Sequence, residues 1–99
     1  HSSPSTAPVE ELEKLAKESA SPYGRMHALC TLDGLKRLSP TTVAQALTDG
    51  HPGVRRQAVR PTSALEEPPI GALLKLVEDP SAKVRLQVAV ELGNISSRK

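Results

Sequence analysis

A repeat with an offset of thirty residues is the feature that most constrains how this chain folds. A repeat of this period, with one supersecondary unit in each copy, is typical of proteins whose neighbouring units stack to bury a shared core. The sequence therefore predicts a stack of about three units. The residues that superpose at this offset are Arg25 with Arg55 and Arg85, His27 with Gln57 and Gln87, and Ala28 with Ala58 and Val88.

Each unit is expected to contain a helix, a turn and a longer helix. Apolar residues recur at helical spacing, and Ser39 followed by Pro40 is a favourable N-cap and first-turn pair. We expect an all-α fold, an α–α superhelix of about three helix pairs, with units at 9–38, 39–66 and 67–96. The helices are expected at 9–19, 23–38, 40–47, 54–65, 69–78 and 82–96.

The composition supports a helical core. The chain contains no Phe, no Trp and a single Tyr, so its apolar residues are mainly Leu, Val and Ala. A sandwich or barrel would normally use aromatic and β-branched residues in its strands, whereas Leu and Ala suit close helix packing. No apolar run approaches the length needed to span a bilayer, and we expect no membrane segment in this chain.

Pro61 interrupts the fourth predicted helix. Proline in a helix interior removes one backbone hydrogen bond and clashes with the preceding turn. We therefore expect a kink or an early end between Val59 and Thr62.

The two ends of the sequence lack helical periodicity. Residues 1–8, HSSPSTAP, predict a disordered lead or linker, and residues 97–99 a short tail. The chain begins with His1 and not with Met, and we expect it to be a fragment of a larger protein.

Two segments, DGHPGVRRQA and DPSAKVRLQVA, resemble the turn and second-helix start of HEAT repeats, particularly the short type first described in phycobilisome lyases. The resemblance covers residues 9–96. It implies a ladder of hydrogen bonds between adjacent repeats, formed by Asp49 with Arg55 and by Asp79 with Arg85. In the first copy Ser19 stands where the aspartate would be, which leaves Arg25 without the same partner.

A looser resemblance concerns residues 25–60. This stretch is similar to the HEAT segment of large planctomycete-type membrane-bound proteins, which also carry a sugar-dehydrogenase-like propeller and a c-type haem domain. No Cys-x-x-Cys-His motif is present in this chain, so the resemblance implies only the repeat portion, without a cofactor. It also implies a bacterial source and a periplasmic or cell-envelope location; without it, a cytoplasmic location is expected.

The motifs of catalysis are missing from the sequence. No Gly-rich phosphate loop and no nucleophile elbow is present. His27 and Cys30 share a helical face, but two ligands do not make a metal site, and a lone Cys is expected in the core. His51, in a turn, is expected to be solvated. We predict no catalytic, cofactor or metal site and do not expect an enzyme.

A local excess of positive charge is the remaining functional signal. Residues 25–60 contain six Lys and Arg against two Asp, a net charge of +4. Arg56 and Arg60 are four residues apart and are expected to project together from one helix, with Arg37 joining them from the preceding unit. The leading hypothesis is a non-catalytic protein-interaction or scaffold module. It would use these three residues to bind another protein or another domain of the same chain.

Two other functions were weighed against this one. The same basic face, which would be concave in such a stack, could bind nucleic acid or another polyanion. Aromatic residues do not interleave with the basic ones to stack on bases, and the net charge of +2 is too small to indicate a polyanion partner by itself. A lyase activity would rest on analogy of fold alone.

Overall fold

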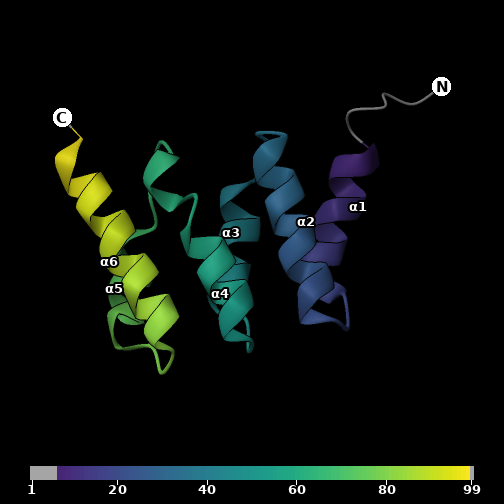
Figure 1. Cartoon of the computed structure of the whole chain (residues 1–99). Coiled ribbons are helices and arrows are strands. Elements are labelled where there is room, and N and C mark those ends of the chain that lie inside the picture. Colours follow the sequence, from purple (N-terminus) through teal and green to yellow (C-terminus); the bar gives the residue numbers. More distant parts are fainter. Residues whose placement is uncertain (1–6, 99) are drawn as a thin grey trace.

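The computed structural model describes residues 7–98, and over this range the chain is entirely helical, without strands. Figure 1 shows three pairs of helices side by side, α1 with α2, α3 with α4 and α5 with α6. The elements are α1 (Ala7–Glu18), α2 (Pro22–Gly34), α3 (Pro40–Leu47), α4 (Pro52–Val59), α5 (Ile70–Lys75) and α6 (Ala82–Ser97), with the short 3₁₀ helices η1 (Thr62–Ala64) and η2 (Leu76–Glu78).

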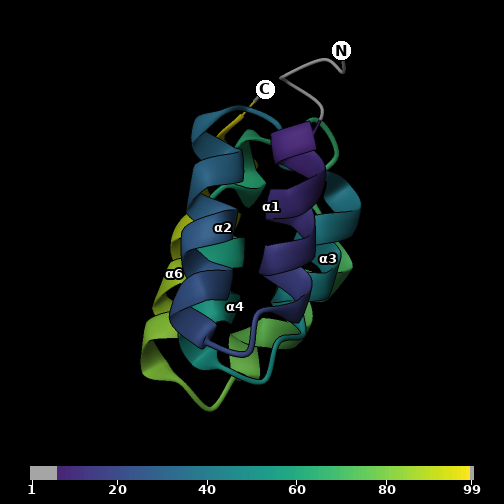
Figure 2. The same ribbon diagram turned by 90° about the vertical axis from the view of Figure 1, so that its right-hand side faces the viewer.

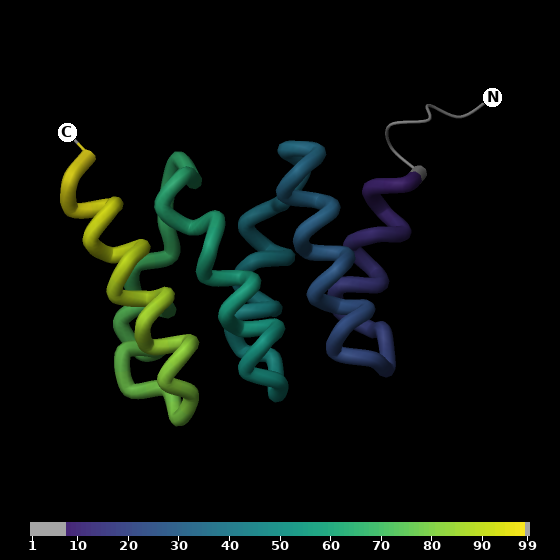
Figure 3. Tube along the Cα trace, viewed as in Figure 1, coloured from purple at the N-terminus to yellow at the C-terminus, as the bar shows by residue number. Residues whose placement is uncertain are grey.

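The pairs are arranged in two layers. Helices α2, α4 and α6 lie in one layer, and a view turned by 90° shows α1 and α3 in the other (Figure 2). Contacts join α2 to α4 and α4 to α6 within the first layer, and α1 to α3 within the second. The chain trace shows the same succession of pairs from the N-terminal to the C-terminal end (Figure 3).

Helices α2, α3 and α4 each begin at a polar cap followed by proline. Ser39 Oγ accepts a hydrogen bond from Thr42 N–H at 3.2 Å, and Pro40 occupies the first helical turn. Ser21 caps α2 in the same way. Such caps satisfy backbone donors that have no partner inside the helix, and proline at the first position has no N–H to lose. The predicted start of α3 at Ser39–Pro40 is confirmed.

The helix ends differ from several expectations. Helix α2 was expected to reach Leu38 but ends at Gly34, because the chain turns at Lys36 with a φ of 59°. Helix α4 ends at Val59, which confirms the early end predicted from Pro61. The fifth helix is split into α5 and η2. Helix α1 begins at Ala7, inside the expected lead; residues 1–6 of that lead and Lys99 of the expected tail lie outside the described residues.

Aliphatic side chains fill the space between the two layers. Leu29, Val59 and Val88 are fully buried, each contributed by the second helix of its pair. First helices contribute Leu47 and Leu73. Burial of such side chains is the main stabilising term in a fold of this kind. Within residues 7–98, none of the helices has both the length and the hydropathy required to cross a membrane.

Candidate functional site

A ladder of arginine–aspartate bonds connects the helix pairs. Arg55 donates from Nε to Asp79 Oδ2 at 2.7 Å and from Nη2 to Asp79 Oδ1 at 3.0 Å, while its Nη1 donates to the backbone oxygen of Asp49 at 2.8 Å. Arg25 repeats this arrangement with Asp49, at 2.8 Å and 3.0 Å, and with the backbone oxygen of Ser19 at 2.7 Å. Each guanidinium therefore forms a two-bond fork with a carboxylate of the following pair.

The register of the ladder corrects the pairing implied by the resemblance. The contact between residues six apart reaches a backbone oxygen, and the contact with the carboxylate spans 24 residues. Arg25, expected to lack a carboxylate, has Asp49, whereas within residues 7–98 Arg85 binds the backbone oxygen of Asp79, at 2.7 Å, and no carboxylate. The expected bonds of Arg55 with Asp49 and of Arg85 with Asp79 therefore form, but through the backbone oxygen of each aspartate and not through its carboxylate.

The turn geometry explains this register. Asp49 Oδ1 accepts a hydrogen bond from His51 N–H at 2.9 Å, and Asp79 Oδ1 accepts one from Ser81 N–H at 2.9 Å. Each carboxylate thus closes its own turn. In that position its oxygens accept hydrogen bonds from the arginine of the preceding helix pair. The arginine of its own pair donates instead to the backbone oxygen of the same aspartate.

The ladder also controls the ionisation of both aspartates. Burial by itself raises the pKa of Asp49, but the hydrogen bonds from Arg25 and from His51 N–H outweigh it, so the pKa lies below its ordinary value. For Asp79, the hydrogen bond from Arg55 lowers the pKa most, and burial only partly opposes it. Both carboxylates are therefore structural anions, held charged by their arginine partners.

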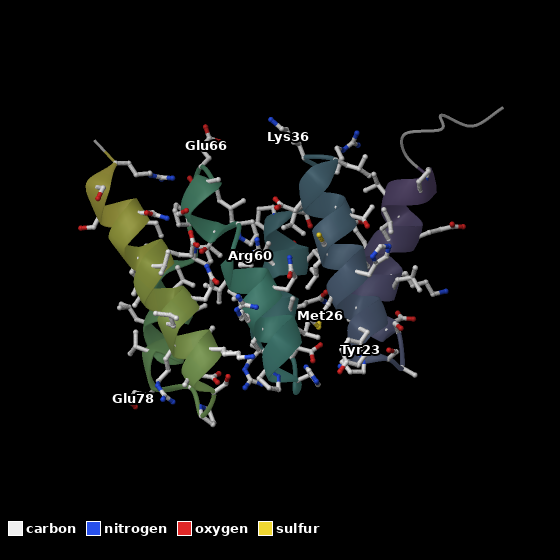
Figure 4. All side chains as sticks on the ribbon, viewed as in Figure 1. Tyr23, Met26, Lys36, Arg60, Glu66 and Glu78 are labelled. Atoms are coloured by element: carbon white, nitrogen blue, oxygen red, sulfur yellow. The ribbon has the colours of Figure 1, made fainter. Side chains whose placement is uncertain are left out.

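The structure places the three basic residues of the predicted patch in two locations. Arg56 lies on α4 and Arg60 is the C-cap residue that directly follows this helix. Both are exposed, and neither makes a side-chain hydrogen bond within residues 7–98. Arg37 follows Lys36 in the loop after α2, because the helix ends before it. Figure 4 shows Lys36 beyond the end of α2, and Lys36 lines a hollow together with Pro61, the residue after Arg60. Arg56 and Arg60 are thus exposed four residues apart, as predicted, and Arg37 lies in a loop and not on a helix.

Apolar residues lie on both sides of this basic pair. The thirty-residue offset aligns Arg56 with Met26 and Leu86, and Arg60 with Cys30 and Val90. The side chains of Leu86 and Val90 are 67% and 47% exposed. We call this surface the second-helix face and define it as Tyr23, Met26 and Cys30 on α2, Arg56 on α4 with Arg60 at its C-cap, and Lys83, Leu86 and Val90 on α6.

A shallow hollow of about 290 Å³ opens at one end of the second-helix face. Met26, which projects from α2 toward α4 in Figure 4, lies on one side of it, and Arg56 and Lys83 line it from α4 and α6. His51 also lines it, with its Nδ1 accepting a hydrogen bond from Gly53 N–H at 2.9 Å. His51 is therefore the N-cap of α4, partly exposed, and not simply a solvated loop residue.

The sequence contained the signal for the residues that were missed. Lys83, Leu86 and Val90 were not predicted as part of the patch, although the offset that aligns Arg55 with Arg85 also aligns Arg56 and Arg60 with two of them.

The predicted environment of Cys30 was wrong. Its side chain is exposed, because Leu29 and not Cys30 points into the core at this turn of α2. Among residues 7–98, no group of three or more His, Cys, Asp and Glu side chains gathers where a metal ion could be held.

Comparison with family models, characterised proteins and solved structures finds no match to this chain.

Proposed function

We propose that this chain is a non-catalytic protein-interaction module, a HEAT-like superhelical stack of three helix pairs. The thirty-residue repeat supports this proposal, together with the two forks of Arg25 and Arg55, which use the same guanidinium atoms on equivalent carboxylates. Repeats of this kind present an extended surface built from equivalent positions of successive units. The two carboxylates whose pKa values are lowered, Asp49 and Asp79, belong to this framework.

The second-helix face is the surface that binds the partner in this proposal. The observation that carries it is the exposure of Leu86 and Val90 beside the guanidinium groups of Arg56 and Arg60, which have no side-chain partner in the described part of the chain. Apolar side chains exposed next to arginine are typical of protein-binding surfaces, where a few large contacts dominate affinity. The partner is therefore a protein segment that carries carboxylates between aliphatic side chains, from another protein or another domain.

Charge complementarity gives this partner its specificity. Carboxylates opposite Arg56 and Arg60 would form charge-assisted hydrogen bonds, while aliphatic side chains cover Met26 on one side and Leu86 on the other. A purely anionic ligand such as nucleic acid would leave the exposed apolar residues of α6 uncovered. For this reason we favour an acidic protein segment over a polyanion.

Charge reversal on the second-helix face tests the proposal. A photoreactive residue at Leu86 is expected to crosslink one partner in cells that produce the protein, and Arg56→Glu with Arg60→Glu should reduce that crosslink at least tenfold. Lys14→Glu with Lys17→Glu makes the same charge change on exposed positions of α1, so this control should retain it. Equal loss in both double variants would contradict the proposal.

A second measurement separates a protein partner from a polyanion. Binding of a labelled single-stranded oligonucleotide would fall steeply with salt if the basic pair neutralised phosphates. We expect no binding at physiological salt. Tight, salt-dependent binding that disappears in the Arg56→Glu and Arg60→Glu variant would favour the polyanion function instead.

A further inference from the structure

Arg85 has an unused side of its guanidinium group. Arg25 and Arg55 each direct Nη1 to a backbone oxygen and direct Nε and Nη2 to a carboxylate 24 residues later. Arg85 makes the first of these contacts, to Asp79 O at 2.7 Å, and within residues 7–98 its Nε and Nη2 have no acceptor. The equivalent forks show what those two donors are positioned to bind, namely both oxygens of one carboxylate.

Around Arg85, apolar side chains are exposed at positions whose counterparts, thirty residues earlier in the chain, are buried. Leu47 is 2% exposed, whereas its counterpart Val77 is 45% exposed. Val59 is fully buried, whereas its counterpart Ala89 is exposed. Helix α6 packs against α4, but in Figure 1 no described residue lies on the other side of α6. We call the set of Val77, Arg85, Ala89 and Leu92 the end face.

We propose that the end face docks a further helix pair whose connecting turn begins with aspartate, and that Arg85 binds that aspartate with its Nε and Nη2. This surface is separate from the second-helix face, so the inference does not depend on the function proposed above. The aspartate must close a helix–turn–helix junction, because Asp49 and Asp79 each also accept a backbone hydrogen bond from the residue two positions later. A free carboxylate or an extended acidic peptide would lack the helices that cover Val77 and Ala89.

A second copy of this chain does not meet these requirements. Its first pair would have to stack on the end face, and in that pair Ser19 occupies the position of Asp49 and Asp79. Ser19 contributes a backbone oxygen to Arg25 but has no carboxylate to offer Arg85. The partner is therefore a helix pair of the type formed by residues 67–96, and not the first pair of another copy.

The probe for this proposal is the third unit of the chain itself. A second copy of residues 67–96, inserted between Ser96 and Ser97, places the copied Asp79 at the same 24-residue distance from Arg85 that separates Asp79 from Arg55. Nuclear magnetic resonance of arginine Nε–H groups should show two slowly exchanging signals in the unextended 99-residue chain, from Arg25 and Arg55. The extended chain should show a third signal, which disappears when the copied Asp79 is changed to Asn.

Thermal unfolding of matched variants supplies the energetic test. In the extended chain, Arg85→Gln should lower the unfolding midpoint as much as Arg55→Gln does, by roughly 5 °C or more. In the unextended chain Arg85→Gln should produce less than half of that shift, because within residues 7–98 the bond to Asp79 O is the one hydrogen bond of the Arg85 side chain. Equal shifts in both chains, or an inserted pair whose amides remain unprotected from exchange, would overturn the proposal.

The unextended chain gives an independent check that needs no insertion. Phenylglyoxal, which modifies accessible guanidinium groups, should react with Arg85 at least tenfold faster than with Arg25 and Arg55, whose forks are occupied. Equal protection of all three arginines would overturn the assignment of an open end face. So would a dimer, detected by sedimentation, that dissociates on Arg85→Gln, because the end face would then bind a second copy.

Discussion

Lys36 occupies a backbone conformation that glycine would adopt at lower cost. Its φ of 59° lies in the left-handed region, which is unfavourable by about 1–2 kcal/mol for residues that carry a Cβ. Two hydrogen bonds hold it there: Lys36 N–H donates to Asp33 O, and Arg37 N–H donates to Leu32 O, both at 2.9 Å. This is the Schellman arrangement that satisfies the last carbonyl groups of α2.

Replacing Lys36 with glycine should therefore stabilise the protein. We expect Lys36→Gly to raise the free energy of unfolding by about 0.5–1 kcal/mol, since the strain is relieved while the exposed side chain makes no hydrogen bond. Urea unfolding followed by circular dichroism measures the change. Lys36→Ala, which removes the side chain and keeps the Cβ, should give no comparable gain; equal gains in both variants would show that the side chain and not the backbone is responsible.

The same residue shows a limit of sequence reasoning. Apolar residues continue at helical spacing through Leu35 and Leu38, and this periodicity predicted a helix to residue 38. A lysine at the left-handed position has no distinguishing signal, because glycine is the residue that normally marks it. The start of α3 was predictable since Ser39 and Pro40 each have a specific physical role at a helix start. Arg37 consequently lies in a loop and not on a helix.

At the scale of elements, η1 is tied to α6 through a buried carboxylate. Glu91 is only 5% exposed, and it accepts hydrogen bonds from Ser63 Oγ at 2.5 Å and from Gln87 Nε2 at 2.8 Å. Arg98 adds donors to the backbone oxygens of Ser63 and Leu65. These contacts hold the segment that follows Pro61 against the last helix.

Removing the Ser63 hydroxyl should loosen this segment. Ser63→Ala leaves one oxygen of a buried carboxylate without its donor, which is expected to lower the free energy of unfolding by about 1–3 kcal/mol. Hydrogen exchange of the amides of residues 62–65 should accelerate more than exchange in α2. Ser97→Ala is the control, because Ser97 Oγ bonds Gly93 O at an exposed site; a similar loss in both variants would contradict a specific role for Ser63.

The connection between helix pairs was less predictable than the helices themselves. Helical spacing and the effect of Pro61 act over a few residues, so they can be read from the sequence. The ladder links Arg55 to two partners, one 6 and one 24 residues away. Both partners involve an aspartate, and only the turn geometry shows that one contributes its backbone oxygen and the other its carboxylate. The residue types were predictable, but the register was not.

At the scale of the whole molecule, the ladder makes the association of the three pairs depend on two ionised carboxylates. Arg25 with Asp49 joins the first pair to the second, and Arg55 with Asp79 joins the second to the third. These side chains are 4–17% exposed, so solvent screens the ion pairs less than it screens pairs on an open surface. Losing either carboxylate charge therefore weakens an interface between pairs and not a local contact.

Acid should therefore destabilise the stack, and the direction follows from the lowered pKa values of Asp49 and Asp79. A depressed pKa in the folded state contributes stability that is complete above the unfolded value, near the ordinary 3.8, and is lost as pH falls through the folded value. At neutral pH, Asp79→Asn should lower the free energy of unfolding by about 2–4 kcal/mol. Urea unfolding across a pH series should show this difference shrinking below pH 3.8, as wild type loses the same charge.

Asp33→Asn, at an exposed carboxylate without hydrogen bonds among residues 7–98, should follow wild type throughout. A difference between Asp79→Asn and wild type that stays constant into strong acid would show that the ladder does not depend on the charge of its aspartates.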